Sequence, residues 1–191
     1  MNGVSSAAAR TEIYARTARV LHWLTVILVA VQLPVGFYMS YRGGTLNVWD
    51  GLTNALYSGH KVGGVLILLL VLWRIAYRLS RGAPADEPTL EPWQRLVSHL
   101  NHWGLYLLLI AVPVAGYIGI SLFPALDIYG FKLPGVVAPD KDAAKAVFEI
   151  HALLALAMVA LIAMHVGAAL HHHLFRKDNV LARMLPSLLK R

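Results

Sequence analysis

The chain has 191 residues, of which 58% are hydrophobic and only 14% are charged. This composition excludes an ordinary soluble domain, because so few charged side chains cannot cover a globule of this size, and it favours an integral membrane protein. Because the chain has no cysteine, it forms no disulfide, no thiolate-held iron–sulfur cluster and no covalent C-x-x-C-H haem attachment. We attribute the formal net charge of +7 to membrane topology and anionic lipid, and we expect no nucleic-acid partner.

Four apolar runs are each long enough to cross a membrane, which takes about 20 residues of helix. The first run follows a basic segment, but it is too long for a signal peptide and no cleavage motif follows it. We therefore expect an all-α, integral membrane four-helix bundle that forms a single membrane domain over residues 1–191. The expected helices cover residues of about 21–40, 60–79, 101–122 and 148–174.

The distribution of Lys and Arg predicts the orientation of the bundle. Twelve of the 17 basic residues fall at the two termini or around the connection between the second and third runs, and five fall on the opposite side. Cytoplasmic segments of membrane proteins carry the excess of Lys and Arg. We therefore expect both termini in the cytoplasm.

Four histidines lie within or at the ends of the apolar runs. His22 and His60 lie near the starts of the first and second runs, and His151 and His165 lie in the fourth. Fourteen residues of α-helix advance about 21 Å in almost four full turns, so His151 and His165 lie on one face near opposite sides of the bilayer. Two rings that far apart cannot share one metal ion. Depth in the bilayer instead pairs His22 with His165 and His60 with His151.

This double pairing predicts two haems, one above the other, each with its iron held by two histidines. A lone histidine in a membrane helix more often forms a hydrogen bond between helices, but four histidines that match in depth across three helices favour ligation. Two histidines fill both axial positions of a haem iron and leave no site for oxygen, so the expected chemistry is electron transfer. A colourless transporter or carrier of divalent metal ions is an alternative.

Other residues fit a flat macrocycle between the helices. Gly36 lies at the height of the outer pair, and Gly64 lies one turn beyond His60, where a missing side chain leaves room for a ring. Arg74 lies at the height of the inner pair and Arg78 one turn below it. A buried cation needs a partner, and a haem propionate would supply one. Close helix packing and snorkelling to the interface are the alternative explanations.

Several motifs make the sequence similar to the prokaryotic cytochrome b561 family. The matching features are HW at 22–23, SGHK-GG at 58–64, Arg74, HLNHWG-Y at 99–106 with Pro113, the spacing of His151 and His165, and the tail HHLFRKDNVLARMLP at 172–186. They span the chain from about residue 14 to residue 186, and the tail is quite specific. The chain resembles in particular the small, stand-alone di-haem members, which include bacterial superoxide oxidases.

The resemblance implies two non-covalent b-type haems, held by the same two histidine pairs, in a multi-pass protein of the bacterial inner membrane. It also implies that periplasmic superoxide gives electrons to the outer haem, held by His60 and His151, and that ubiquinone accepts electrons within the membrane. The expected activity is that of a superoxide:ubiquinone oxidoreductase. Relatives on this scaffold also serve as cytochrome b subunits that relay electrons between a dehydrogenase or hydrogenase partner and the quinone pool, which is the alternative function.

Two further groups of residues follow from this function. His99, His102, His172 and His173 lie near the cytoplasmic ends of the third and fourth helices, where they would contact a haem propionate or a quinone; the alternative is that they mark the headgroup region. On the outer side, five basic residues are balanced by five acidic ones, so the segments as a whole do not attract an anion. A local pair of Lys61 and Lys132 near the outer haem is the candidate for attracting superoxide.

Overall fold

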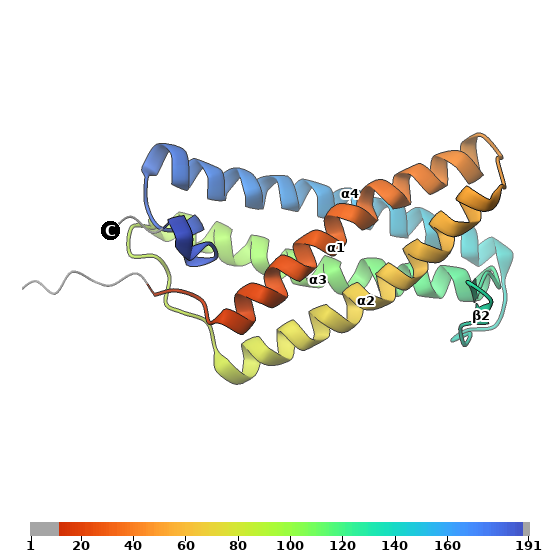
Figure 1. The fold of residues 1–191 in the computed structure, drawn as a ribbon, viewed down its shortest axis with the longest axis horizontal. Coiled ribbons are helices and arrows are strands. Elements are labelled where there is room, and N and C mark those ends of the chain that lie inside the picture. Colours follow the sequence, from red (N-terminus) through yellow and green to blue (C-terminus); the bar gives the residue numbers. More distant parts are fainter. Residues whose placement is uncertain (1–11, 189–191) are drawn as a thin grey trace, which may run out of the picture.

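The computed structural model describes residues 12–188 and contains four long helices. These are α1 (Arg16–Ser40), α2 (Gly51–Arg81), α3 (Pro92–Leu122) and α4 (Lys141–His171). Each is long and apolar enough to cross a membrane, which confirms the predicted helical membrane bundle. Both ends of the described chain and the α2–α3 connection lie at one end of the bundle, called here the terminal end (Figure 1). The α1–α2 connection and a small β-hairpin lie at the other, the hairpin end.

All four helices begin before the apolar runs, and polar residues cap the starts of three of them. At α2 the carboxylate of Asp50 accepts hydrogen bonds from the backbone N–H and the hydroxyl of Thr53, at 2.8 and 2.9 Å, and lies 2.6 Å from Nη2 of Arg42. These contacts, led by the two from Thr53, lower the pKa of Asp50 to about 2. At α4 the carboxylate of Asp140 accepts from two backbone N–H groups, and α3 begins with a capping box at Glu91.

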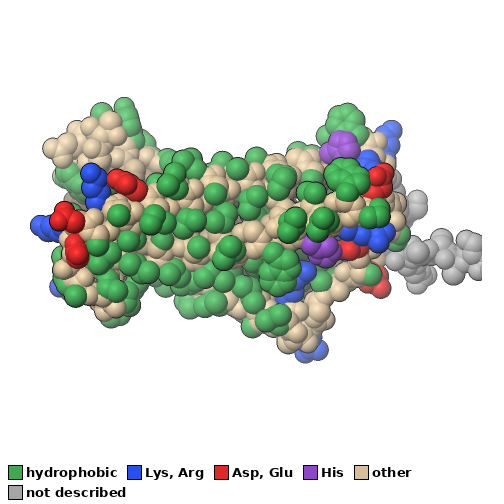
Figure 2. All heavy atoms as spheres, turned by 180° about the vertical axis from the view of Figure 1, so that it is seen from behind, with side chains coloured by type: hydrophobic (Ala, Val, Ile, Leu, Met, Phe, Trp, Pro, Cys, Tyr) green, Lys and Arg blue, Asp and Glu red, His purple; other side chains and the backbone are tan. Residues whose placement is uncertain are grey.

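The surface of the bundle has the pattern of a membrane protein. Hydrophobic side chains cover its central band, whereas Lys, Arg, Asp and Glu gather towards the two ends (Figure 2). The helices bury a smaller apolar core between them, made of Val29, Ile67, Val71, Tyr106, Leu108, Leu109, Val112 and Met158. Apolar side chains therefore face both the interior and the lipid. This arrangement is stable in a membrane because the backbone N–H and C=O groups of a helix bond to each other and need no water.

The helices do not pack equally closely. The backbones of α3 and α4 approach along much of their length, as do those of α1 and α2, and α2 also packs against α3. In contrast, α4 has little close backbone contact with α1 or α2. Side chains that project from α4 towards α1 and α2 therefore enter two wider spaces between helices.

Two short segments close the ends of the bundle. Strands β1 (Asp127–Ile128) and β2 (Phe131–Lys132) form an antiparallel hairpin whose turn has positive φ at Tyr129 and Gly130, 45° and 85°, the pattern of a tight hairpin turn. The hydroxyl of Tyr129 donates to the carbonyl of Ala55 and so holds the hairpin on α2. At the terminal end the chain leaves α4 through a π-helical turn, His172–Arg176, and reverses at Lys177, which has a left-handed φ of 56°.

Candidate functional site

The four membrane histidines form two ring pairs across the spaces beside α4. His22 on α1 and His165 on α4 have ring centroids 6.2 Å apart, with an angle of 64° between the ring planes. His60 on α2 and His151 on α4 have centroids 6.2 Å apart and planes at 88°. The first is called here the terminal-end pair and the second the hairpin-end pair. The structure thus brings together the same residues that depth in the bilayer paired.

The distance within each pair fits two ligands of one metal ion. A metal–imidazole bond is about 2 Å long and a ring nitrogen lies about 1 Å from the ring centre, so two imidazoles on opposite sides of one ion have centres about 6 Å apart. Both pairs meet this distance, at 6.2 Å. Within residues 12–188 no group of three or more His, Asp or Glu side chains is arranged around a metal site. Each pair therefore suits an ion whose other ligands come from a macrocycle.

The ring of His151 is held in the tautomer that a metal ligand requires. Its Nδ1 lies 2.8 Å from the carbonyl oxygen of Val112 on α3. A carbonyl only accepts hydrogen bonds, so Nδ1 carries the proton and Nε2 keeps a free lone pair. A hydrogen bond of this kind to the second ring nitrogen orients most histidines that bind metals. No sequence signal had identified the Val112 carbonyl.

Glycines line both rings of the hairpin-end pair. A β-carbon built on Gly36 of α1 would lie 2.9 Å from Cε1 of His60, and one on Gly116 of α3 would lie 3.0 Å from Cε1 of His151. Each imidazole therefore occupies space that a side chain at the facing position would fill. A β-carbon on Gly64 would meet nothing within 4 Å, which leaves the open space that a macrocycle needs. The sequence identified Gly36 and Gly64 but missed Gly116.

A half-buried glutamine lies beside His60. The amide nitrogen of Gln32 donates to the carbonyl of Gly59 over 3.3 Å, and its side chain lies where Gly63 has no β-carbon. The Oε1 atom of Gln32 and the Nδ1 atom of His60 are both buried without a hydrogen-bond partner. A metal-bound imidazole needs an acceptor for its Nδ1–H, and the unpartnered Oε1 of Gln32 is a candidate for this role. Sequence analysis did not identify it.

Two arginines and a third histidine surround the terminal-end pair. Nη2 of Arg74 lies 3.0 Å from Nδ1 of His22, and the guanidinium groups of Arg74 and Arg78 lie 5.2 and 6.0 Å from the ring centre of Tyr106. The ring of His102 lies 5.3 Å from that of His165. Among the described residues no carboxylate forms an ion pair with either arginine. Because a guanidinium only donates, the contact with Arg74 fits the tautomer of His22 whose Nδ1 is unprotonated. Arg74 would have to turn from His22 to an anionic group, such as a haem propionate, for Nε2 of His22 to bind a metal ion, and Arg78 could contact the same group.

The other predicted histidines lie in polar contacts at the terminal end. His99 pairs with Asp86 at 3.1 Å, with both side chains more than 40% exposed. His172 pairs with Asp178 at 2.6 Å, with side chains only 9% and 5% exposed. His173 is half-buried. Since Asp178 engages Nδ1 of His172, this ring belongs to the packing of the tail rather than to the histidine pairs.

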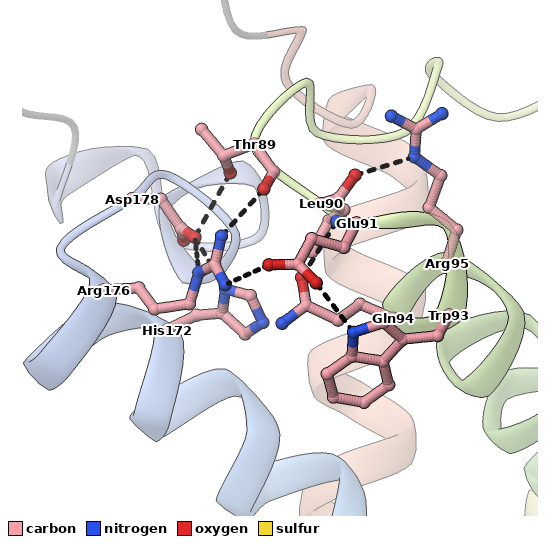
Figure 3. Close-up of polar contacts among 9 residues, drawn as sticks. All are labelled: Thr89, Leu90, Glu91, Trp93, Gln94, Arg95, His172, Arg176 and Asp178. Atoms are coloured by element: carbon pink, nitrogen blue, oxygen red, sulfur yellow. Dashed lines mark hydrogen bonds and ion pairs between the residues drawn. The ribbon is translucent and has the colours of Figure 1, made fainter.

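The tail is tied to the α2–α3 connection by a polar network around Asp178 (Figure 3). The carboxylate of Asp178 accepts from the hydroxyl of Thr89 at 3.2 Å and lies 3.6 Å from Nε of Arg176. Arg176 also donates to the carbonyl of Thr89 and approaches the carboxylate of Glu91 at 3.9 Å. Arg176 and Asp178 of the tail motif thus contact Thr89 and Glu91 of the α2–α3 connection. The motif alone did not identify these partners.

A second buried group lies next to this network. Arg183 is 7% exposed and donates to the backbone carbonyls of Glu12 and Ala85. Glu87 is 4% exposed, and its Oε2 has no hydrogen-bond partner. Burial raises the pKa of the Glu87 carboxyl, and the positive charge of Arg183 partly offsets that rise.

At the hairpin end, the two lysines that we expected to attract superoxide both lie next to Asp127. Nζ of Lys61 donates to the backbone carbonyl of Asp127 over 2.9 Å, and Lys132 lies directly opposite Asp127 in the hairpin. Lys61 follows His60 in the sequence, so its backbone adjoins the hairpin-end pair, and its contact with Asp127 joins the hairpin that carries Lys132 to α2.

Comparison with known proteins gives consistent similarity along almost the whole chain. The sequence profile of the family described as prokaryotic cytochrome b561 matches residues 13–187. The chain is 32% identical to cytochrome b561 homolog 2 of Escherichia coli (strain K12) over 176 residues, 91% of this chain and 92% of the relative. It is 29% identical to cytochrome b561 homolog 1 of the same strain over 181 residues, 91% and 97% of the two chains. It is 30% identical to a Yersinia pestis protein named "Probable superoxide oxidase CybB" over 170 residues, 87% and 92%.

Proposed function

The chain belongs to the prokaryotic cytochrome b561 family, whose members are membrane proteins that bind b-type haem, and we propose that it is a di-haem superoxide:ubiquinone oxidoreductase. The observation that carries this proposal is the presence of two histidine pairs, each with ring centroids 6.2 Å apart, between α4 and two different helices. One pair lies towards each end of the bundle. Together they would supply the protein ligands of two haems across the membrane.

The chain's own residues have distinct parts in holding the two haems. His22 and His165 would bind the iron at the terminal end, and His60 and His151 at the hairpin end. Haem b bound there would supply one-electron transfer. Arg74 and Arg78 would neutralise propionates at the terminal end.

The proposed orientation places the terminal end in the cytoplasm and the hairpin end in the periplasm of a bacterial inner membrane. Twelve of the 17 basic residues belong to the two terminal segments of the sequence or to the region around the α2–α3 connection, and Lys and Arg are in excess on the cytoplasmic side of membrane proteins. The four spanning helices and the family support a bacterial membrane protein. In this orientation His60 and His151 lie nearest to the periplasm.

The reaction would convert two superoxide ions, one ubiquinone and two protons into two molecules of oxygen and one ubiquinol. Lys61 and Lys132 would raise the local concentration of the superoxide anion beside the hairpin-end pair. The relative named "Probable superoxide oxidase CybB" supports this substrate. His60 and His151 mark the entry point of the electrons; no separate catalytic side chain is assigned.

Ubiquinone reduction consumes protons, and His102 is the first candidate to hold one near the terminal-end pair. Its ring is 5.3 Å from that of His165, and its Nδ1 is 3.5 Å from the hydroxyl of Ser98. His99 is more exposed and would exchange protons with the cytoplasm. His172 is a weaker candidate, because Asp178 already occupies its Nδ1.

A dithionite-reduced minus oxidised spectrum of the purified protein, with haem quantified per chain, tests the first half of the proposal. We expect two b-type haems per chain; a colourless protein would instead favour a divalent-ion carrier. Stopped-flow mixing with superoxide tests the second half, since the hairpin-end haem should be reduced within the mixing experiment and reoxidised by added ubiquinone. A protein with two haems that superoxide does not reduce would contradict the substrate but keep the haem assignment.

The second candidate is a cytochrome b subunit that relays electrons between a partner dehydrogenase or hydrogenase and quinone. Two observations favour it. The hairpin-end segments contain five basic and five acidic residues, so they have no overall attraction for an anion. The hairpin residues Tyr129 and Phe131 are 64% and 76% exposed, so they offer a contact surface for a partner protein. Co-purification of a redox partner, together with haems that superoxide fails to reduce, would establish this function instead.

A further inference from the structure

Two adjoining apolar hollows flank the start of α1 at the terminal end. The first, of about 350 Å³, lies between α1 and the tail and reaches Ile27 and Met184. The second, of about 220 Å³, lies between α1 and α2 and reaches Trp73. Arg16 and Leu24 border both. The hollows therefore lie on the two sides of one helix and share its outward face.

The hollows combine apolar walls with two arginines. Val20, Leu24 and Ile27 are 49%, 47% and 59% exposed, so they face the lipid. Arg16 and Arg19 lie at the mouth of the first hollow. Among residues 12–188 neither arginine has an ion-pair partner, and the Nε atom of Arg19 is buried without a hydrogen-bond partner. A desolvated guanidinium N–H of this kind requires an acceptor.

These features together indicate the chemistry of an occupant, and we infer that the hollows bind one anionic diacyl phospholipid that straddles the start of α1. Its phosphate would contact Arg16 and Arg19, and one acyl chain would lie in each hollow. From Arg16 to Ile27 the helix rises about 16 Å, roughly the half-thickness of a hydrocarbon core of about 30 Å. The hollows therefore extend over the depth of one leaflet.

An anionic phospholipid fits this surface better than ubiquinone does. The ubiquinone headgroup is uncharged and does not account for two unpaired arginines. It also has a single isoprenoid tail, whereas two adjoining hollows flank the outward face of the helix. The inference does not depend on which electron donor the protein uses.

Native mass spectrometry of the purified, haem-loaded protein tests the inference. The probes are phosphatidylglycerol and phosphatidylcholine with identical acyl chains, titrated separately after removal of co-purified lipid. We expect one phosphatidylglycerol to remain bound per chain at a concentration where phosphatidylcholine does not. With about 1 kcal/mol per Arg–phosphate contact, Arg16→Gln or Arg19→Gln should weaken phosphatidylglycerol binding about fivefold and the double variant about thirtyfold.

The matched control is the double variant Arg81→Gln and Arg95→Gln, which removes two exposed arginines at the same end but outside the hollows. It should leave the affinity unchanged. Leu24→Trp, which fills both hollows, should weaken binding more than Ile27→Trp, which fills only one. Equal retention of the two lipids, or an equal effect of the control variant, would overturn the inference. Displacement of phosphatidylglycerol by ubiquinone, one for one, would also overturn it and assign the hollows to the quinone.

Discussion

Gly36 of α1 and His60 of α2 are in direct contact, with a β-carbon at position 36 reaching within 2.9 Å of Cε1 of the ring. Gly36→Ala should therefore displace the imidazole and lower haem occupancy at the hairpin end, so that total haem falls from two towards one per chain. Gly116→Ala should do the same from the other side, through His151. Haem is measured by pyridine haemochrome assay against protein concentration.

Gly104→Ala is the matched control for these glycine variants. Its β-carbon would also approach within 2.9 Å of a side-chain atom, but that atom is Cδ1 of Leu161. This variant should cost packing stability without loss of the hairpin-end haem. If Gly104→Ala removes haem as strongly as Gly36→Ala, general disruption of the bundle rather than displacement of His60 is the cause.

Substitution of single histidines should separate the two haems. His60→Ala or His151→Ala should remove the hairpin-end haem, and His22→Ala should remove the terminal-end haem. Each variant should keep about one haem per chain, because the other histidine pair is intact. His102→Ala is informative because its ring lies even closer to His165 than that of His22 does, 5.3 against 6.2 Å. We expect His102→Ala to keep both haems. Loss of the terminal-end haem in His102→Ala, with retention in His22→Ala, would reverse the pairing.

The two haems should differ in their electron paramagnetic resonance spectra. The angle between the two axial imidazole planes sets the splitting of the iron d orbitals, and nearly perpendicular planes give the most anisotropic low-spin signal. The hairpin-end rings are at 88° and the terminal-end rings at 64°. The more anisotropic signal should therefore disappear in His60→Ala and persist in His22→Ala. The opposite assignment would show that haem binding rotates the rings.

The buried pair of His172 and Asp178 should stabilise the terminal end far more than the exposed pair of His99 and Asp86. Removing one partner of a buried pair costs about 3 kcal/mol, whereas exposed pairs contribute about 1 kcal/mol or less. Asp178→Ala should therefore speed hydrogen exchange in the tail and in the α2–α3 connection. Asp86→Ala should leave exchange there nearly unchanged. Equal effects would mean that the network of Figure 3 does not hold the tail.

Glu87 should make the stability of the terminal end depend on pH. Burial raises the pKa of its carboxyl, so the folded state favours the protonated form. The stabilisation is complete below the ordinary glutamic acid pKa and is lost as the pH rises through the raised value. Glu87→Gln mimics the protonated form and should raise thermal stability at pH 7.5 but have little effect near pH 4. Lower stability of the variant at pH 7.5 would instead mean that attraction to Arg183 outweighs burial.

The sequence predicted the number of helices but placed all four of their starts too late. Hydropathy locates the part of a helix that lies in lipid, whereas α2 begins at Gly51 and α4 at Lys141, in polar segments. The signals for three of these starts are present in the chain as the caps at Asp50 and Asp140 and as Pro92 at the first position of α3. Capping residues outside an apolar run therefore extend the helices beyond the expected ranges.

The histidine pairs could be predicted because depth along a helix follows directly from sequence position. Gly116 and Gln32 could not, because their roles depend on how α3 and α1 are rotated about their axes. A helix that is apolar on all sides gives no periodic signal for this rotation. His172 was difficult for another reason: its partner Asp178 reaches it only because the chain reverses at Lys177, where a residue other than glycine has a positive φ.

The contacts of the tail with α1 also bear on how the bundle is assembled during synthesis. The indole N–H of Trp23 donates to the carbonyl of Met184, 161 residues later in the chain, and the backbone N–H of Tyr14 donates to the carbonyl of Arg183. The ribosome makes α1 before the residues that fasten it. Until Arg183 and Met184 have been made, the first helix lacks these contacts, so a nascent chain that stalls earlier would present an open bundle to the proteases that survey the membrane.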